Sequence, residues 1–380
     1  EDTVEFHCHG SPAVLAAGLE ALYLAGARPA KRGEFTKRAF LNGKLDLTQA
    51  EAVIDLIDAE TAAAARNAAA QLDGGLRRKL EPIQDALLEI SSRFYAVVDY
   101  PDEDIEDVHP DQVAAALETA RTQLDLLLAS CRRGRVLKSG VRTAIIGRPN
   151  AGKSSLLNAL AGYERAIVTH IPGTTRDTVE ESVLCGGTLL RLIDTAGIRD
   201  TDDIVEQMGV ERSRAAMESA DLVLAVMDSS VTPTQEDAAV LELAATHPNW
   251  ILVSSKNDLP SAPVPFLQFG ENQYPPTAMV SLSAHTGAGL DQLEAAVSAL
   301  FPVGDPKESG SLLTDQRQEE AARRASIAIG RARDAMVSGL TPDAILTDVE
   351  EALDALGELT GRSAKEEIVS RIFSRFCVGK

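Results

Sequence analysis

Short apolar runs alternate with helical spacing through the middle of the chain. The runs cover residues 143–146, 189–193, 222–227 and 251–253. Apolar runs without polar alternation are typical of strands buried on both faces, as in a parallel sheet covered by crossover helices. The pattern therefore predicts an α/β domain over residues 139–303.

Both flanks of this domain carry helical spacing instead of short runs. Apolar residues recur three or four positions apart over 80–98 and 111–131, which predicts helices there. Helix starts are predicted by capping pairs at Thr48 with Glu51, Thr341 with Pro342 and Ser363 with Glu366. We predict one helical domain built from residues 44–138 and 304–380, with the α/β domain inserted between its two parts.

The beginning of the chain combines a strand pattern with a helix pattern. Residues 3–9 alternate between apolar and polar side chains, and residues 12–25 have helical spacing. The alternation is already under way at Glu1, so we expect sequence to precede it. Residues 1–43 are therefore predicted to be the C-terminal part of a small α+β domain whose start is missing.

Composition narrows the class of protein. Of 380 residues 44% are hydrophobic, and the formal net charge is -20. Proteins that coat nucleic acids or membrane surfaces rely on excess Lys and Arg, so the acidic balance argues against both and limits RNA contact to a local patch. No run approaches the ~18 apolar residues that span a bilayer, so no membrane insertion is expected. Four scattered cysteines favour a reducing, cytoplasmic location.

A phosphate-binding motif follows the first predicted strand of the α/β domain. Residues 147–154 read Gly-Arg-Pro-Asn-Ala-Gly-Lys-Ser and precede a helical run, which is the setting of a P-loop. Backbone N–H groups of such a loop surround a phosphate. Lys153 is expected to reach the β- and γ-phosphate oxygens, and Ser154 to bind Mg²⁺. A chance glycine turn would not explain the full signature in this setting.

Two more polar segments have the order expected of a GTP site. Residues 194–197, Asp-Thr-Ala-Gly, follow the run 189–193, so their Asp is expected at the carboxyl end of a strand and their Gly near the γ-phosphate. Residues 173–177 read Gly-Thr-Thr-Arg-Asp, where the hydroxyl of Thr174 or Thr175 would complete the Mg²⁺ shell. Taken alone, this second segment is equally consistent with an ordinary turn.

A base-recognition motif follows the last of the apolar runs. Residues 255–258 read Ser-Lys-Asn-Asp, and Asp258 is expected to accept both N–H groups on the edge of guanine, a pattern that adenine lacks. Ser255 departs from the usual Asn or Thr, which predicts weaker base affinity. Residues 281–285 are expected to back the guanine ring.

The sequence leaves the hydrolytic residues open. Ile198 stands where many GTPases have a Gln that orients the attacking water. Asn150 and the loop 169–174 would suit a monovalent cation that adds positive charge at the phosphates, or Asn150 would only brace the loop. Glu206 is the favoured carboxylate for positioning water, although a solvated surface position is the common fate of such a residue.

Three segments together resemble one known family. The run 33–52, the Gly-Thr-Thr-Arg-Asp loop and the ending Phe-Cys-Val-Gly-Lys closely resemble the MnmE (TrmE) family of tRNA-modification GTPases over the whole chain. The resemblance implies a Ras-like P-loop G domain inserted in an all-α domain. It also implies that a tetrahydrofolate-binding domain of α+β fold, which dimerises, precedes the helical domain.

The same resemblance implies site residues. Family positions for GTP match Asn150, Ala151, Gly152, Lys153, Ser154, Ser155, Thr169, His170, Ile171, Pro172, Gly173, Thr174, Thr175, Asp194, Thr195, Ala196, Gly197, Ser255, Lys256, Asn257, Asp258, Ser283, Ala284 and His285. Potassium positions match Asn150, Thr169, Ile171 and Thr174, and magnesium positions match Ser154 and Thr175. Catalytic positions match Glu206, Lys153 and Cys377, and folate positions match Glu5, Lys44 and Lys380.

The family also implies a reaction and partners. GTP hydrolysis would be stimulated by K⁺ when two G domains of a homodimer meet. With the flavoprotein MnmG (GidA), which carries FAD, the protein would form a heterotetramer that adds an aminomethyl or carboxymethylaminomethyl group to C5 of the tRNA wobble uridine. A 5-formyl- or methylene-tetrahydrofolate would supply the one-carbon unit. The alternatives are a regulatory GTPase switch or ribosome-assembly factor without modification chemistry, and a potassium-responsive scaffold.

Some features keep two interpretations. Glu5, His7 and His9 share one face of the predicted strand, which suits a polar ligand wall, or a metal site that would want a third ligand. Cys377 is either a buried apolar thiol or a residue of the modification chemistry. Four arginines gather on one helical face that would contact tRNA or a partner, or simply be solvated: Arg323, Arg324, Arg331 and Arg333.

Overall fold

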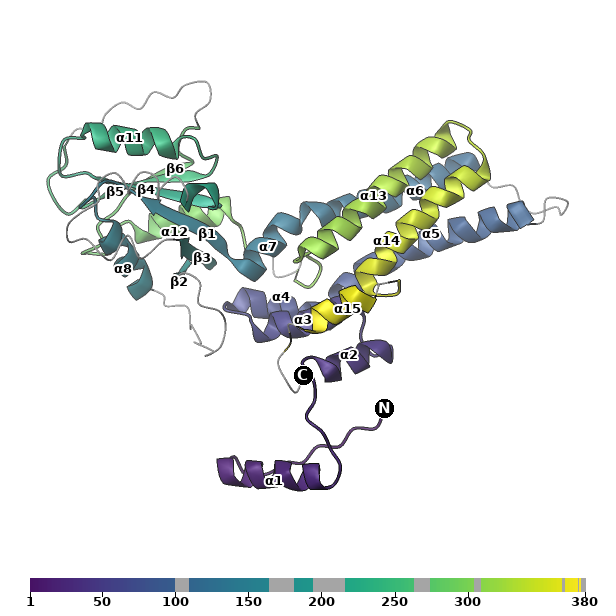
Figure 1. Ribbon diagram of the computed structural model, residues 1–380. Coiled ribbons are helices and arrows are strands. Elements are labelled where there is room, and N and C mark those ends of the chain that lie inside the picture. Colours follow the sequence, from purple (N-terminus) through teal and green to yellow (C-terminus); the bar gives the residue numbers. More distant parts are fainter. Residues whose placement is uncertain are drawn as a thin grey trace. The chain divides into compact units, whose positions relative to one another are not determined.

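The computed structural model describes residues 1–99, 109–163, 181–193, 216–262, 274–303, 309–363, 366–374 and 376 (Figure 1). The chain divides into two compact units. The first consists of Glu1–Ile57, Ala68–Ala129 and Gln316–Lys380. The second consists of Asp58–Asn67 and Ser130–Asp315.

The second unit is built on a six-stranded sheet. Its strands are β1 (Val141–Ile146), β2 (Glu181–Cys185), β3 (Thr188–Ile193), β4 (Leu222–Asp228), β5 (Trp250–Ser255) and β6 (Ala278–Ser281). Their order is β2-β3-β1-β4-β5-β6, and all neighbouring pairs except β2 with β3 are parallel. The predicted parallel sheet is therefore confirmed.

Strand β2 was absent from the sequence prediction. It pairs antiparallel with β3 through a two-residue turn in which Gly186 and Gly187 both have positive φ values, 57° and 78°. Glycine adopts such angles without strain, and this turn chemistry favours a tight hairpin. The strand lies at the edge of the sheet, where the apolar signal is weaker than in central strands.

Helices cover both faces of this sheet. They are α7 (Cys131–Ser139), α8 (Lys153–Tyr163), α11 (Gln235–Ala244) and α12 (Leu290–Leu300). Leu157 of α8 and Leu293 of α12 pack with Leu224 on one face, and Leu241 of α11 packs with Val223 on the other. All seven positions of β4 are buried, because its side chains alternate between two covered faces.

The first unit is helical. It contains α1 (Pro12–Leu24), α2 (Glu34–Leu41), α3 (Leu47–Ile57), α5 (Gly75–Asp99), α6 (Pro110–Ala129), α13 (Gln316–Val337), α14 (Pro342–Thr360) and α15 (Glu366–Phe373), and α4 (Ala62–Leu72) spans the boundary between the units. Figure 1 shows α13 and α14 lying along α6 and α5. Helices from both ends of the chain thus share one bundle.

A buried polar cluster joins helices from the two ends of the chain. Glu51 of α3 accepts hydrogen bonds from Arg317 Nε at 3.0 Å and Arg317 Nη2 at 2.8 Å, and Gln318 Nε2 donates to it at 2.8 Å. Glu51 is 7% exposed and Gln318 1%. Removing one partner of such a buried pair typically costs about 3–5 kcal/mol, because a charge is left buried and unpaired. The cluster therefore fixes α13 against α3.

Two local predictions were wrong. The start of α3 is capped by Asp46, not by Thr48, since Asp46 Oδ1 accepts from Gln49 N at 2.9 Å and Asp46 N donates to Gln49 Oε1 at 3.0 Å. Glu51, the supposed partner of Thr48, is turned inward instead. Residues 1–9 form no strand, and within the described residues no neighbouring strand is present to pair with them. The predicted start of α14, with Thr341 before Pro342, is confirmed.

Candidate nucleotide-binding site

The loop 147–152 connects the end of β1 to the start of α8. At Gly147 a Cβ atom would lie 2.5 Å from the carbonyl oxygen of Val226 in β4, so only glycine fits. At Gly152 the φ angle is 102°, and a Cβ atom would lie 3.1 Å from Ser255 Oγ. Asn150 also has a positive φ, 59°. These residues let the loop curve tightly in front of the helix N-terminus, where anions are favoured.

Lys153 is folded back onto this loop. Its Nζ donates hydrogen bonds to the carbonyl oxygens of Gly147 at 2.7 Å and Arg148 at 2.8 Å. Burial lowers the pKa of Lys153, and the nearby charge of Arg148 lowers it further. An anion at the loop would oppose both effects, since it stabilises the protonated amine. Ser154 and Ser155 follow on the first turn of α8, as the motif requires.

Ser255 connects the base-recognition motif to the phosphate loop. Its Oγ lies within hydrogen-bond distance of the carbonyl oxygens of Ala151 and of Met227, the latter at 3.1 Å. The side chain is buried, with 3% exposure. The departure from Asn or Thr noted in the sequence thus has a structural role: the short hydroxyl reaches the phosphate loop directly.

Asp258 lies beside the other predicted base-contacting loop. Its carboxylate is hydrogen bonded to Ser283, which lowers the pKa of Asp258, and the charge of His285 acts in the same direction. The backbone ties the two segments together, since Asn257 N donates to Leu282 O at 3.2 Å. Asp258 is exposed and ionised, so it offers carboxylate oxygens to N–H donors, which is the chemistry that reading a guanine edge requires.

Several predicted site residues lie outside the described residues. These are Thr169, His170, Ile171, Pro172, Gly173, Thr174, Thr175, Asp194, Thr195, Ala196, Gly197, Glu206, Cys377 and Lys380. Their roles stay predictions. Strand β3 ends at Ile193, directly before Asp194 in sequence, and it is the parallel neighbour of β1.

The predicted folate residues that are described, Glu5 and Lys44, are both exposed. Glu5 pairs with His7 Nε2 at 3.2 Å. Among the described residues, no three His, Cys, Asp or Glu side chains gather as a metal site. Gly43 and Leu45, the two neighbours of Lys44, line a pocket in the helical unit.

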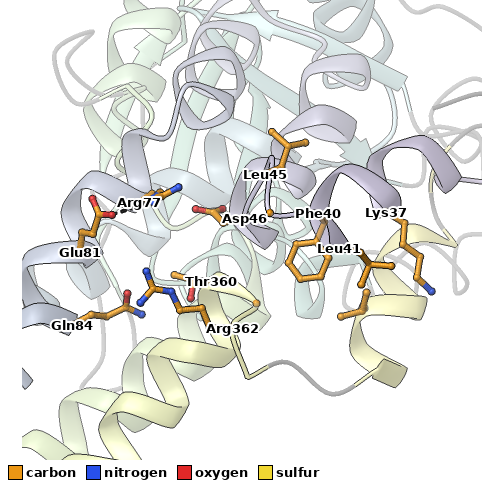
Figure 2. A pocket seen from close by; sticks show the side chains of 13 residues that line it. Lys37, Phe40, Leu41, Leu45, Asp46, Arg77, Glu81, Gln84, Thr360 and Arg362 are labelled. Carbon is orange, nitrogen blue, oxygen red and sulfur yellow. Dashed lines mark hydrogen bonds and ion pairs between the residues drawn. The ribbon is translucent and has the colours of Figure 1, made fainter. Parts of the chain in front are cut away.

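This pocket, about 560 Å³ in volume, was not predicted from the sequence. Figure 2 shows the polar side chains of Asp46, Arg77, Gln84 and Arg362 on one side and Phe40 with its apolar neighbours on the other. Asp46 Oδ2 is buried and has no hydrogen-bond partner, and Gln84 is only 4% exposed. The lining residues come from separate helices and from two turns, residues 43–46 and 361–362, so no local sequence motif predicts the pocket.

The arginine face of α13 is neutralised within the helical unit. Arg323 pairs with Glu319 at 2.6 Å, and Arg331 with Asp348 at 2.8 Å and with Glu351. The other two pairs are Arg324 with Glu358, and Arg333 with Glu118 and Asp334. Each of the four arginines therefore has a carboxylate partner within the helical unit, and the choice between a face that contacts tRNA or a partner and a solvated face stays a prediction. No described helix has the length and apolar character that would let it cross a membrane.

The fold and the site define a class. A parallel sheet carries a phosphate loop after β1 and an Asp-containing base loop after β5, which is the arrangement of a P-loop GTPase domain. Comparison with known families matches residues 47–377 to the MnmE helical domain and residues 1–44 to the GTP-binding protein TrmE N-terminus. The chain belongs to the MnmE family of tRNA modification GTPases.

Relatives with sequence similarity over the whole chain are tRNA modification GTPases. The tRNA modification GTPase MnmE of Natranaerobius thermophilus is 44% identical over 100% of this chain and 82% of its own length. The corresponding protein of Chloroflexus aurantiacus is 45% identical over 100% of this chain and 83% of its own. Among solved structures, a GTP-binding protein from Sulfolobus solfataricus in complex with GDP is 13% identical over 58% of this chain and 66% of that one, with a TM-score of 0.29, too low to support any inference.

The hydrogen bond between Ser255 and the phosphate loop is expected to contribute to nucleotide affinity. Replacing Ser255 with Ala removes the hydrogen bond to Ala151 O, so affinity for GDP should fall about fivefold, the equivalent of about 1 kcal/mol. Calorimetric titration measures the change, and Ser261→Ala, an exposed serine nearby, should leave affinity unaltered. Equal affinities in the two variants would show that the bond does not position the loop.

Proposed function

We propose that the chain binds and hydrolyses GTP between the β1–α8 loop and the loop after β5, in the service of tRNA wobble uridine modification. The family membership supports the GTPase activity and its place in tRNA modification. The location of the site rests on one observation. Ser255, in the same motif as Asp258, is hydrogen bonded to the phosphate loop, and Lys153 is hydrogen bonded to the same loop. A single nucleotide spanning the two loops would present its phosphates to Lys153 and its base to Asp258.

The described part of the site fits the metal ions of the proposal. Ser154 is the second residue of α8, beside the phosphate loop, where its hydroxyl suits Mg²⁺ together with Thr175. Asn150 is exposed in the loop with a positive φ, so its amide oxygen is available to K⁺ together with Thr169, Ile171 and Thr174. When bound, K⁺ would supply positive charge against the negative charge that develops on the phosphates. Glu206 would orient water.

A tetrahydrofolate, as the 5-formyl or methylene form, is proposed as the one-carbon donor in the helical unit. Lys44 and Lys380 would contact its anionic tail, and Glu5 its pterin ring. The pocket next to Lys44 supports this proposal, because its volume is that of a small-molecule site. The unpartnered Asp46 Oδ2 suits N–H donors of a pterin, and Arg362 suits the carboxylates of a glutamate tail.

The remaining partners follow from the same proposal. Two copies of the chain would meet through their G domains, and the flavoprotein MnmG would bring FAD and complete a heterotetramer on tRNA in the cytoplasm. Cys377 would take part in the modification. The second candidate, a regulatory switch or assembly factor without modification chemistry, shares the nucleotide site but gives no use to the pocket of Figure 2.

Deleting the gene in the source organism tests the reaction. The C5-modified wobble uridine nucleosides should disappear from hydrolysed tRNA, and mass spectrometry measures them. The native gene should restore them, whereas Lys153→Ala should not, because the phosphates would lose their cation. Unchanged nucleosides in the deletion strain would leave the regulatory switch as the function.

Potassium dependence tests the role of Asn150. GTPase rates should be at least about tenfold higher in KCl than in NaCl at equal ionic strength, since a bound cation stabilises charge in the transition state. Asn150→Ala should make the rates in the two salts equal. If the variant keeps the preference for KCl, Asn150 only braces the loop.

Arg362 tests the folate pocket. Arg362→Ala should weaken binding of 5-formyl-tetrahydrofolate about tenfold, the usual effect of losing a hydrogen bond to a charged group. Calorimetric titration provides the measurement, and Arg93→Ala, an exposed arginine of α5 paired with Glu89, is the matched control. Equal binding by the two variants would place the folate elsewhere.

A further inference from the structure

Two buried carboxylates, one at the end of β4 and one in the first turn of α11, lie outside every nucleotide motif. Asp228 is the last residue of β4 and is 5% exposed. Asp237 is the third residue of α11 and is 3% exposed. Each one is paired with a cation from a different nucleotide loop, so this segment, 228–237, contacts both ends of the candidate site.

The first pair holds the phosphate loop. Asp237 Oδ1 accepts a hydrogen bond at 3.0 Å from Nε of Arg148, whose side chain is 18% exposed. The other oxygen, Oδ2, accepts from Thr234 N at 2.9 Å and Thr234 Oγ1 at 2.8 Å, the capping box of α11. The helix N-terminus stabilises this carboxylate, so Asp237 is a fixed anchor for Arg148.

The second pair holds the base loop. Asp228 Oδ2 accepts from Lys256 Nζ at 2.6 Å, and Asp228 Oδ1 accepts from Ser230 N at 2.9 Å and Ser230 Oγ at 2.6 Å. Although burial by itself would raise the pKa of Asp228, the hydrogen bonds from Lys256 and Ser230 lower it. Lys256 has a φ of 58°, an angle that costs energy for a residue with a side chain. The ion pair offsets that cost.

The position of Arg148 also fixes Lys153. The carbonyl oxygen of Arg148 accepts a hydrogen bond from Lys153 Nζ. Arg148 is therefore bound to Asp237 through its side chain and to the predicted phosphate-binding Lys153 through its backbone. Ser255 links the two loops directly, because its Oγ donates a hydrogen bond to Ala151 O. The spacing between the phosphate loop and the base loop is thereby fixed by the side chains of Asp237, Asp228 and Ser255. Their partners in the nucleotide motifs lie 89, 28 and 104 positions away in the sequence.

We propose that segment 228–237 sets the spacing of the two nucleotide loops, with Asp237 and Arg148 as positioning residues for the phosphates and Asp228 as the positioning residue for the base loop. This inference rests on the proposed binding of GTP. The Arg148–Asp237 pair holds the phosphate loop in position. Loss of the pair should therefore lower the affinity for a nucleotide more when the nucleotide has more phosphates in contact with the loop. The base loop keeps its own anchor.

Asp237→Asn separates this role from general stability. The amide oxygen can still accept from Thr234, so α11 keeps its cap, while Arg148 loses its charged partner. Affinity for GDP should fall about tenfold while affinity for GMP changes little, and the preference for GDP over inosine diphosphate should persist. Competition against a fluorescent guanine nucleotide gives the three affinities. Glu236→Gln, an exposed carboxylate one position earlier, is the control and should match the unaltered protein.

A double-mutant cycle supplies the second measurement. Arg148→Met combined with Asp237→Asn should weaken GDP binding no more than either single change, because one interaction is removed once. Should Asp237→Asn fail to fold, Arg148→Lys carries the test, with a smaller loss for GDP because Lys keeps the charge but not the guanidinium geometry. Equal losses for GMP and GDP, or additive effects in the cycle, would overturn the inference.

The outcome is distinguishable from failure of the proposed function. If the unaltered protein binds neither GTP nor GDP, the nucleotide site itself is wrong. If it binds both and the Asp237 and Arg148 variants bind them equally well, only the positioning role of segment 228–237 is wrong.

Discussion

The close approach of Gly147 to the backbone of β4 is the constraint on which the candidate site depends. Any side chain at this position would overlap the carbonyl oxygen of Val226, since a Cβ atom would lie only 2.5 Å from it. The first residue of the loop after β1 therefore packs directly against β4, the neighbouring strand of the sheet. That contact places the start of α8, and with it Lys153, at the carboxyl edge where β4 and β5 also end.

From this edge the electrostatics of the site can be understood. The chain is strongly acidic, and in the described part of the helical unit Arg323 pairs with Glu319 of α13 itself and Arg331 with Asp348 of α14, so this helix face is not a free basic surface for phosphate. Positive charge is instead concentrated at the loop, where Lys153 and Arg148 lie close enough for one to lower the pKa of the other. Asp237 compensates Arg148, which leaves Lys153 as the cation turned toward the loop carbonyls. Positive charge is thus presented to phosphate by a local, partly buried arrangement of side chains.

What the sequence could predict follows from how far apart the interacting residues are. The strands β1, β3, β4 and β5 were predictable because burial on both faces leaves an uninterrupted apolar run. The phosphate loop was predictable because its residues are consecutive. The edge strand β2 was missed, since an edge strand tolerates polar residues such as Glu181 and Ser182. The capping pair of α3 was assigned two residues too late, because Asp46 with Gln49 and Thr48 with Glu51 are equivalent patterns in sequence, and only burial decides that Glu51 serves Arg317.

Pairs of residues that lie far apart in the sequence could not be predicted, because no local pattern connects the two partners. Nothing near Arg148 in sequence points to Asp237, and nothing near Ser255 points to Ala151. Arg191 of β3 is a further case: its guanidinium donates to Ser139 O at 2.6 Å, Ser182 Oγ at 3.3 Å and Glu60 at 2.6 Å. This one side chain ties β3 to the end of α7, to the edge strand and to the segment before α4. Because β3 ends at Ile193, just before the Asp194 motif, a shift of β3 along its axis would strain all three contacts together.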